Sequence, residues 1–416
     1  MDNLLIKAGE YDEQDELKSF RNQFFIPKDK EGNDLIYLCG NSLGLQPNTV
    51  KPAVENVLDS WAKNGVEGHT DGEFPWLPYH EFLTENMANV VGARPSETIV
   101  MNSLTVNLHL MMVSFYTPVP GKHKILVESG LFPSDQYAVA SQIRFHGYDP
   151  EDSIVYLKGA NDFVSDADIE ACFAENGDNI ALVMIGGVNY YSGQYYNLPL
   201  ITRLAKQYGC KIGFDLAHGA GNIVPDLHEL GADFAVWCTY KYLNSGPGAL
   251  AGAFIHSNHE DWDSKPRFEG WWGNNKEKRF KMEDQFLPLR GAEGWQLSNP
   301  PIMAMAPIRA SLEIFKDAGM NRLRAKGKKL SSFLIECLQE LDAANLEIIT
   351  PLDPDKRGCQ VSIRLLNPDK QLFNALLAAG VIADWREPDV IRVAPVPLYN
   401  TFQDIFRFYE LLKKNI

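Results

Sequence analysis

The chain has 416 residues, of which 45% are hydrophobic and 22% are charged, and this composition excludes a disordered chain and favours a globular one. The length favours two domains that share an interface over a single core. The net charge of −15 at pH 7 argues against a nucleic-acid binder, which needs a basic face, whereas helix N-termini and a few local cations still allow a small anionic ligand.

The N-terminal segment and the cysteines predict a cytoplasmic protein. The first residues carry several carboxylates and lack the basic start and apolar run of a signal peptide, and no apolar run has the length of a membrane helix. The six cysteines lie far apart and form no CxxC pair, so we interpret them as reduced core thiols. We therefore expect neither a membrane nor a nucleic-acid partner.

Short apolar runs alternate with helix-like segments through the first three quarters of the chain. The runs are residues 124–129, 180–188, 210–218, 232–241 and 248–256. Apolar strands that alternate with helices are typical of a parallel sheet covered on both faces. Residues 198–209 supply one such helix, with Leu200, Leu204 and Tyr208 at helical spacing. We therefore predict a large α/β domain over residues 66–300, with a three-layer architecture and a mainly parallel sheet.

After Pro300 and Pro301 the pattern changes to that of an α+β domain. Residues 302–341 predict a long helical stretch. Short strand-like runs follow at residues 346–350, 359–365 and 390–395. We predict a smaller C-terminal domain over residues 301–416, against which an N-terminal segment of residues 1–65 packs.

Two segments of the large domain begin helices with residues that suit a cofactor. Ser103 and Thr105 precede an apolar run, where they either cap a helix or, with the first N–H groups, bind a phosphate. Phe132 and Asp135 follow a strand, where they either form a plain turn or stack on and hydrogen-bond an aromatic ring. These segments alone leave both alternatives open.

Asp215 ends an otherwise apolar strand, and a buried carboxylate is costly there unless it is paired. One interpretation is a helix cap for the segment that starts at Leu216. The other is a partner for a protonated pyridine nitrogen, which keeps the ring electron-withdrawing. His218 either lines the same pocket or is an ordinary buried histidine.

Lys241 ends the next apolar strand, directly before a Gly-rich turn. A lysine in this place is usually a solvated strand end. However, ligands of open α/β sheets bind beyond the carboxyl ends of the strands, and lysine forms Schiff bases with aldehyde cofactors. The order along the chain, from helix start to aromatic residue, carboxylate and lysine, matches the aminotransferase-like class of pyridoxal-phosphate enzymes.

Seven segments, four of which contain the candidate site residues named above, make the resemblance specific. They are NSLTVNLHL (102–110), FPSDQYA (132–138), GFDLAHGAGN (213–222), WCTYKYLN (237–244), GWWG (270–273), LSNPP (297–301) and IRVAP (391–395). With them the chain closely resembles the kynureninase family, from LCGNSLGLQP (38–47) to IRVAPVPLYN (391–400).

The resemblance implies a fold-type I, aminotransferase-like hydrolase of carbon–carbon bonds that uses pyridoxal 5′-phosphate. The implied reaction hydrolyses L-kynurenine, and we expect also 3-hydroxy-L-kynurenine, to anthranilate or 3-hydroxyanthranilate and L-alanine. This chemistry serves tryptophan degradation or the synthesis of pyridine nucleotide precursors.

The resemblance also implies roles for individual residues. Lys241 carries the cofactor, Asp215 pairs with its ring nitrogen, and Tyr240 is our candidate for the proton relay. The residues expected to bind the cofactor are Leu104, Thr105, Phe132, Pro133, Ser134, Asp135, Asp215, His218, Tyr240 and Lys241. Trp271 and Asn299 are expected to reach the site from the partner subunit of a homodimer. Arg392 is expected to clamp the substrate α-carboxylate, and the residues expected around the aromatic end of the substrate are Ser42, His69, Ser298 and Asn299.

Two residues depart from the family pattern. Gly186 stands where several relatives have a hydroxyl residue near the phosphate, so one phosphate hydrogen bond is missing or is replaced by backbone. Asn274 stands where animal relatives tend to have histidine, which leaves the contacts around the substrate ring open.

Another fold-type I enzyme, such as an aminotransferase or a cysteine desulfurase, is the nearest alternative. A desulfurase needs a reactive cysteine, and Cys359 lies beside Lys356 and Arg357, whose charges favour a lower thiol pKa. The apolar residues that follow favour the start of a strand instead.

Two alternatives come from other classes of protein. A non-catalytic pyridoxal-binding protein would lack reactive residues that are present here. A metalloenzyme would use Asp215 with His218, or His256 with His259, but we interpret the last two as solvated surface histidines and expect no metal.

Overall fold

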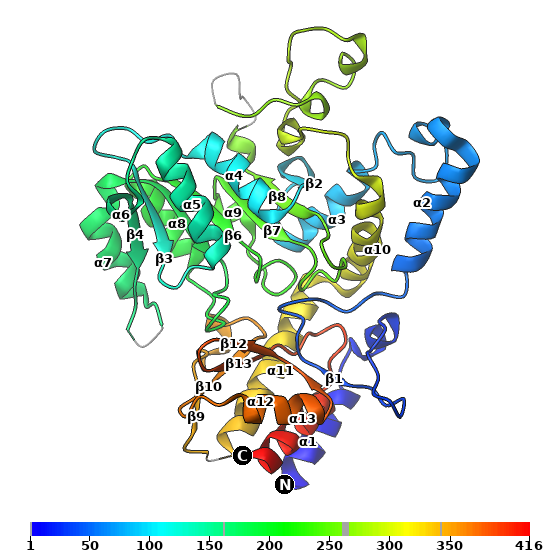
Figure 1. Ribbon diagram of the computed structural model, residues 1–416, viewed down its shortest axis with the longest axis vertical. Helices are drawn as coiled ribbons and strands as arrows, with labels where there is room; N and C mark the ends of the chain where they lie inside the picture. The colour runs from blue at the N-terminus through cyan, green and yellow to red at the C-terminus, as the bar shows by residue number, and fades with distance from the viewer. Residues whose placement is uncertain (1, 161–162, 260–265, 342) are drawn as a thin grey trace.

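The computed structural model describes residues 2–160, 163–259, 266–341 and 343–416, which form a large and a small domain (Figure 1). The large domain contains a seven-stranded sheet with the order β2-β8-β7-β6-β5-β3-β4. Its strands are β2 (Thr98–Met101), β3 (Lys124–Glu128), β4 (Ile154–Leu157), β5 (Ile180–Gly186), β6 (Lys211–Asp215), β7 (Phe234–Cys238) and β8 (Ala251–Ile255). Strands β3 to β7 pair in parallel and β8 is antiparallel to both of its neighbours, which confirms the predicted, mainly parallel sheet.

Helices cover both faces of this sheet, as predicted for strands that are apolar throughout. The helices of the large domain are α2 (Val50–Asn64), α3 (Glu81–Val91), α4 (Leu104–Phe115), α5 (Pro133–Phe145), α6 (Pro150–Ser153), α7 (Asp166–Asn176), α8 (Leu198–Gln207), α9 (Leu227–Leu230) and α10 (Ile302–Ala318). Alternate residues of one strand enter different clusters: Phe234 and Val236 pack with α4 and α5, while Ala235 and Trp237 pack on the opposite face. The large domain therefore has three layers, because every strand has two faces to bury.

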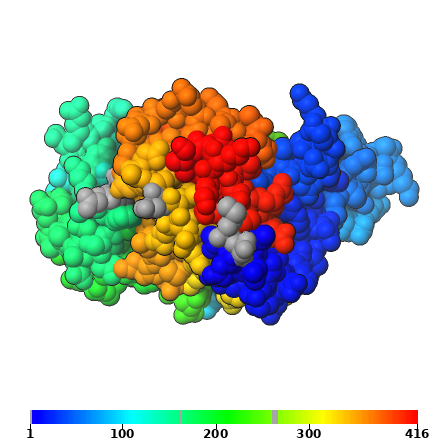
Figure 2. Space-filling view, turned by 90° about the horizontal axis from the view of Figure 1, so that it is seen from below, coloured from blue at the N-terminus to red at the C-terminus, as the bar shows by residue number. Residues whose placement is uncertain are grey.

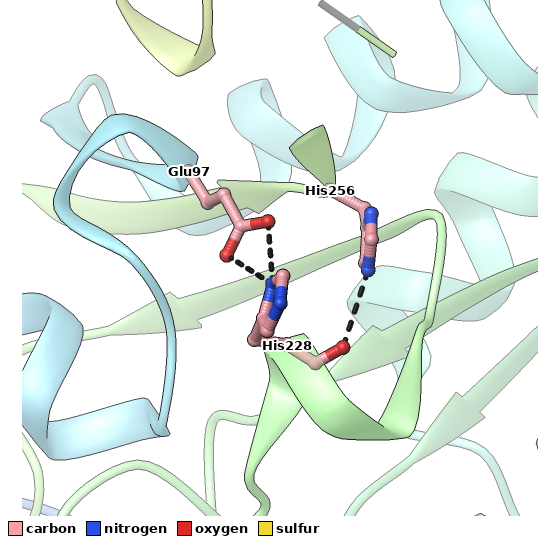
Figure 3. Close-up of side chains that lie close together, drawn as sticks. All are labelled: Glu97, His228 and His256. Atoms are coloured by element: carbon pink, nitrogen blue, oxygen red, sulfur yellow. Dashed lines mark hydrogen bonds and ion pairs between the residues drawn. The ribbon is translucent and has the colours of Figure 1, made fainter. Parts of the chain in front are cut away.

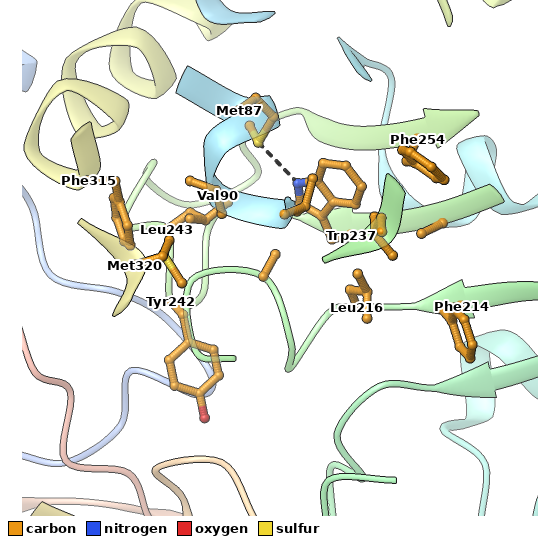
Figure 4. Close-up of a cluster of buried hydrophobic side chains, with 14 of the residues drawn as sticks. Met87, Val90, Phe214, Leu216, Trp237, Tyr242, Leu243, Phe254, Phe315 and Met320 are labelled. Carbon is orange, nitrogen blue, oxygen red and sulfur yellow. Dashed lines mark hydrogen bonds between the residues drawn. The ribbon is translucent and has the colours of Figure 1, made fainter. Parts of the chain in front are cut away.

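The core beneath β7 also fixes the chain around Lys241 (Figure 4). Leu243 is 1% exposed, and burying a side chain of this size contributes about 1.5–3 kcal/mol. Trp237 lies in the same cluster, and its Nε1 donates to the sulfur of Met87 on α3 at 3.3 Å. A Cβ at Gly252 of β8 would lie 2.2 Å from the Trp237 ring, so only glycine lets the indole lie against that strand. The lysine thus leaves a strand end that the core holds in place.

The small domain contains a four-stranded antiparallel sheet with the order β12-β13-β10-β9. Its strands and helices are β9 (Leu346–Ile348), β10 (Val361–Leu365), β12 (Asp384–Arg386), β13 (Val390–Val393), α11 (Met320–Gln339), α12 (Lys370–Ala378) and α13 (Phe402–Asn415). Two N-terminal elements join this domain, since α1 (Asp2–Glu13) packs against α13 and β1 (Ile36–Tyr37) pairs with β11 (Val381–Ile382). Figure 2 shows the N-terminal residues in blue beside the C-terminal ones in red.

The predicted helical stretch 302–341 consists of two helices, α10 and α11. They meet at Gly319, whose φ of 74° lies in the left-handed region that favours glycine. Because α10 packs against α2 and α3 of the large domain, the chain passes into the small domain near Gly319, later than residue 301. Through its contact with α10, the helix α2 packs on the large domain, although it belongs to the N-terminal segment that we predicted to pack against the small domain.

Short 3₁₀ helices occupy many of the connections. They are η1 (Lys18–Gln23), η2 (Gly65–His69), η3 (Pro95–Glu97), η4 (Gly177–Asn179), η5 (Ser257–His259), η6 (Trp271–Gly273), η7 (Arg279–Lys281), η8 (Ala292–Trp295) and η9 (Pro354–Lys356). None of the helices formed by the described residues combines the length and the apolar character needed to cross a membrane.

Candidate active site

One cavity lies at the carboxyl edge of the large sheet. Glu128, Gly186 and Asp215 end the strands β3, β5 and β6, and Lys241 follows β7. The residues that line the cavity are Leu104, Thr105, Glu128, Phe132, Ser134, Asp135, Gly186, Val188, Tyr190, Asp215, Ala217, His218, Tyr240 and Lys241. The four motifs that the sequence singles out therefore meet at the edge where open α/β sheets bind their ligands.

The amine of Lys241 is held by His218. Its Nζ lies 3.0 Å from His218 Nε2 and 5.9 Å from the centre of the Phe132 ring. Burial, reinforced by the charge of Lys241, lowers the pKa of His218 well below its usual range. The imidazole is therefore neutral and accepts a hydrogen bond from the lysine, which directs the amine into the cavity.

Three buried carboxyl groups, those of Glu128, Asp135 and Asp215, also line the cavity. Asp215 Oδ1 accepts the N–H of Ala217 at 2.6 Å, and its carboxyl group shares a hydrogen bond with Asp135. Burial and the charge of Asp215 raise the pKa of Asp135 well above its usual range. Burial likewise raises the pKa of Glu128 to about 7. Since Lys241 is the one cationic side chain among the lining residues, the cluster favours a further cationic group in the cavity, such as a protonated pyridine nitrogen.

Two helix N-termini form another wall of the cavity. The first residue of α4 is Leu104, and the side chain of the preceding Ser103 makes no capping hydrogen bond, so that predicted alternative is wrong. The hydroxyl groups of Thr105 and Ser134, in the first turns of α4 and α5, lie 2.8 Å apart. Hydroxyl groups and helix N-termini together bind phosphate well. The residues present thus fit both ends of a phosphorylated pyridine.

Arg392 on β13 lies beside this cavity. Its Nη1 donates to the carbonyl oxygen of Tyr190 at 2.7 Å, and Tyr190 contacts the Phe132 ring edge to face at a centroid distance of 5.2 Å. A buried guanidinium group that contacts the cavity lining through Tyr190 suits a substrate carboxylate.

Known proteins with similar sequences decide the family. The chain is 51% identical over 408 residues to the kynureninase of Myxococcus xanthus, which covers 98% of this chain and 96% of that protein. It is 49% identical over 411 residues to the kynureninase of Koribacter versatilis, with 98% and 97% covered. This chain belongs to the kynureninase family. The family model of the kynureninase C-terminal domain matches residues 323–412, and the resemblance predicted from the seven motifs is confirmed.

Solved structures confirm the fold of this kynureninase family member. The cysteine desulfurase CsdA from Escherichia coli superposes with a TM-score of 0.77 at 16% identity, over 95% of this chain and 97% of that one. A cysteine desulfurase from Thermococcus onnurineus gives a TM-score of 0.76 at 17% identity, over 95% and 97%. The cystine C–S lyase C-DES gives 0.75 at 17% identity, over 91% and 97%, and in another of its structures a glycine is covalently linked to the cofactor PLP. At such low identity these likenesses show the fold alone, which is the predicted fold type I.

Several predicted site residues lie outside the lining of this chain's own cavity. Pro133 belongs to the first turn of α5 without lining the cavity, and the half-buried Ser42 follows β1. His69 ends η2, where its Nδ1 lies 2.9 Å from the carbonyl oxygen of Val66. The remaining ones, Trp271, Ser298 and Asn299, are exposed. The roles predicted for these residues stay predictions.

The cavity also contains residues that the sequence reasoning missed. Glu128 ends its apolar strand in the same way as Asp215 does, so the same argument could have found it. Its Oε2 accepts the N–H of Gly186 at 3.0 Å, and a Cβ at position 186 would lie 2.7 Å from Oε1. The departure at Gly186 thus makes room for a buried carboxyl group. Tyr190 lies in an irregular segment and gave no signal.

Cys359 does not have the properties of a reactive thiol. Burial raises its pKa to about 12, and its backbone N–H donates to Asn222 Oδ1 at 3.0 Å. Burial outweighs the positive charge of Arg324, which lowers this pKa, and the Arg357 guanidinium group donates to Ser331 and Ser332. The strand β10 begins at Val361, so Cys359 lies two residues before the strand and not, as the strand interpretation predicts, at its first position.

The interpretation of His256 and His259 as solvated surface residues is wrong. His256 is 8% exposed, and His259 forms an ion pair with Asp233 at 2.7 Å. Both residues flank a short turn that packs against the large domain, so the polar sequence HSNH marks a buried network.

Glu97, His228 and His256 lie close enough together to suggest a metal site (Figure 3). Glu97 Oε1 lies 2.8 Å from His228 Nδ1 and also accepts the N–H of Ser257 at 2.9 Å. His256 Nδ1 accepts the N–H of Asn258 at 3.0 Å, and its Nε2 lies 3.2 Å from the carbonyl oxygen of His228. Protein hydrogen bonds thus account for this cluster, which anchors η3, α9 and η5 to one another.

Proposed function

We propose that this protein hydrolyses L-kynurenine to anthranilate and L-alanine, with pyridoxal 5′-phosphate as its cofactor. The observation that carries the proposal is the meeting of Lys241 and Asp215 in one cavity, with the uncapped N-terminus of α4 at its wall. Membership of the kynureninase family over 98% of the chain supports the substrate, and the carboxyl cluster and the hydroxyl groups of Thr105 and Ser134 support the cofactor. We extend the proposal to 3-hydroxy-L-kynurenine and to a cytoplasmic location.

When bound, pyridoxal phosphate attaches covalently to an amine, and its protonated ring withdraws electrons from the carbon atoms beside that amine. Lys241 provides the amine that holds the cofactor and afterwards takes and returns a proton at the substrate Cα. Asp215 would pair with the protonated ring nitrogen, and burial together with the Asp215 charge raises the pKa of the neighbouring Asp135. His218 keeps the lysine amine directed at the reacting carbon.

Tyr240 is the proposed proton donor for the addition of water. It lines the cavity, and burial raises the pKa of its hydroxyl group, so the group stays protonated at neutral pH. In the overall reaction one water molecule adds to the aryl ketone and the bond between Cβ and the carbonyl carbon breaks. Tyr240 donates to the carbonyl oxygen as the water adds, and the new alanine Cβ receives a proton.

The substrate is proposed to extend from Arg392 towards the exposed loops. Arg392 binds the α-carboxylate, and the residues proposed around the aromatic end are Ser42, His69, Ser298 and Asn299. Trp271 is 43% exposed and lies outside the cavity of its own chain. We therefore propose that Trp271 and Asn299 complete the site of a partner subunit in a homodimer.

The function is tested with purified protein supplied with pyridoxal phosphate and L-kynurenine. We expect equal amounts of anthranilate and L-alanine to form, as measured by chromatography. Transfer of the amino group to a keto acid, without anthranilate, would instead identify an aminotransferase and overturn the proposal.

A further inference from the structure

Two arginines of the small domain share one carboxylate at the edge of the cavity. Asp384 on β12 lies directly opposite Arg392 on β13 in the antiparallel register. Arg392 Nε donates to Asp384 Oδ1 at 3.2 Å, and its Nη2 lies 2.8 Å from Oδ2. Arg386 approaches the same carboxylate, with its Nε 3.1 Å from Oδ1 and its Nη2 3.3 Å from Oδ2. The cluster therefore carries one positive charge in excess.

This cluster is linked through Tyr190 to the cavity that contains Lys241. The Arg392 side chain is 1% exposed and the Asp384 side chain 10% exposed, and Arg392 is tied to Tyr190 of the cavity lining. Positive charge from both arginines adds to the lowering of the pKa of His218, after the larger effects of burial and of Lys241. The excess charge is thus close to the proposed reaction centre.

Two nitrogen atoms of the cluster make no well-aligned hydrogen bond with the described residues. Arg392 Nη2 and Arg386 Nε are buried, and although both lie near Asp384, neither makes a hydrogen bond of acceptable geometry. A buried charged N–H group with a poorly aligned hydrogen bond gains stability from a better-placed acceptor, such as an oxygen atom of a ligand. The two donors come from different arginines, so an acceptor with two oxygens could bind both.

We infer that Arg386 and Arg392 bind the α-carboxylate of the substrate together, and that Asp384 is a positioning residue that holds the two guanidinium groups side by side. The inference rests on the proposed function and adds Arg386 and Asp384 to its carboxylate site. Two guanidinium groups at this distance repel each other, and Asp384 offsets that repulsion before the substrate arrives. One bound carboxylate then brings the net charge of the cluster to zero.

The test compares L-alanine with L-alaninamide, which lacks the carboxylate, as ligands of the cofactor-loaded enzyme. Binding is followed by the absorbance of the cofactor. We expect the wild type to prefer L-alanine. Arg386→Gln should weaken L-alanine binding about tenfold, the loss expected for one charged hydrogen bond, and leave L-alaninamide binding unchanged.

The variant Asp384→Asn distinguishes two roles of Asp384: it either positions the two arginines or competes with the substrate carboxylate for them. If Asp384 positions the arginines, this variant binds L-alanine more weakly and has a higher KM for L-kynurenine at a similar kcat. If Asp384 merely competes with the substrate for Arg392, the variant binds L-alanine more tightly, and the inference is wrong.

The control variant is Arg364→Gln, which removes an arginine of the same sheet that pairs with Glu347. It should bind both ligands as the wild type does. A wild type that does not prefer L-alanine, or an Arg386→Gln variant with unchanged L-alanine affinity, would overturn the inference. Absence of L-kynurenine hydrolysis with the ligand pattern intact would instead reject only the proposed function.

Discussion

The cofactor end and the substrate end of the site are built in different ways. The cofactor end consists of strand ends and helix starts of one domain, and its polar groups are buried or half-buried, with hydrogen bonds such as those of Lys241 with His218 and of Thr105 with Ser134. The substrate end combines Arg392 of the small domain with exposed loop residues such as Ser298 and Asn299. The cofactor end carries the reacting groups, and the substrate end is formed by residues from different parts of the chain. We therefore expect substitutions at the first to lower turnover and substitutions at the second to weaken substrate binding.

Lys241→Ala should have the largest effect, because no other group can hold the cofactor and return the Cα proton. We expect turnover of L-kynurenine to fall by on the order of 10⁴-fold or more, together with loss of the visible absorbance of the bound cofactor. Assays and spectra of the purified variant measure both. Lys63→Ala, at an exposed lysine of α2, is the matched control and should behave as the wild type. Unchanged turnover in Lys241→Ala would show that Lys241 does not carry the cofactor, and the proposed cofactor end would be wrong.

Asp215→Asn should come next. The amide cannot keep the ring nitrogen protonated, so kcat should fall about 10²- to 10³-fold, while the phosphate contacts retain part of the cofactor binding. Stopped-flow kinetics and cofactor titration measure the two effects separately. A variant that loses the cofactor altogether would show that Asp215 mainly holds the cofactor in place.

Arg392→Gln tests the substrate end. Loss of a buried charged contact should raise the KM for L-kynurenine about 10- to 100-fold and leave the cofactor spectrum unchanged. Steady-state kinetics provide the KM and absorbance provides the spectrum. An altered spectrum at normal KM would place Arg392 at the cofactor end.

The raised pKa of Glu128, at the cofactor end, predicts that the free energy of unfolding depends on pH. Its pKa is raised to about 7 in the folded protein, so the folded state binds the proton more tightly than the unfolded state. The resulting stabilisation is present in full below the ordinary pKa of glutamate and is lost as the pH rises towards 7. Between pH 5 and pH 8 the loss should be about 2–3 kcal/mol, which urea unfolding of the cofactor-free protein measures. Glu128→Gln should lose this part of the dependence, and an identical pH profile for both proteins would contradict it.

The two ends also differ in what the sequence could predict. Asp215 and Lys241 were found because a charged residue at the end of an apolar strand is a local pattern, and Glu128 follows the same pattern. Arg386 and Asp384 could not be found in this way, because their role depends on the strand register that sets Asp384 opposite Arg392.

His256 and His259 are residues for which the local sequence predicted the wrong environment. The turn around His256 is polar in sequence, yet Glu97 from a segment far away in the chain buries it. Burial of this kind depends on which distant segments pack together, and residue composition alone does not predict it. The domain boundary near Gly319 also depends on distant packing, because the contacts of α10 with α2 and α3 place α10 in the large domain.

The central claim is that the cofactor is bound to Lys241 within reach of Asp215. Borohydride reduction of the cofactor-loaded enzyme makes that bond permanent, and mass spectrometry of its peptides locates it. We predict a single modified lysine at position 241 and no modification in Lys241→Ala. A modification at another lysine, or none in the active wild type, would contradict the account.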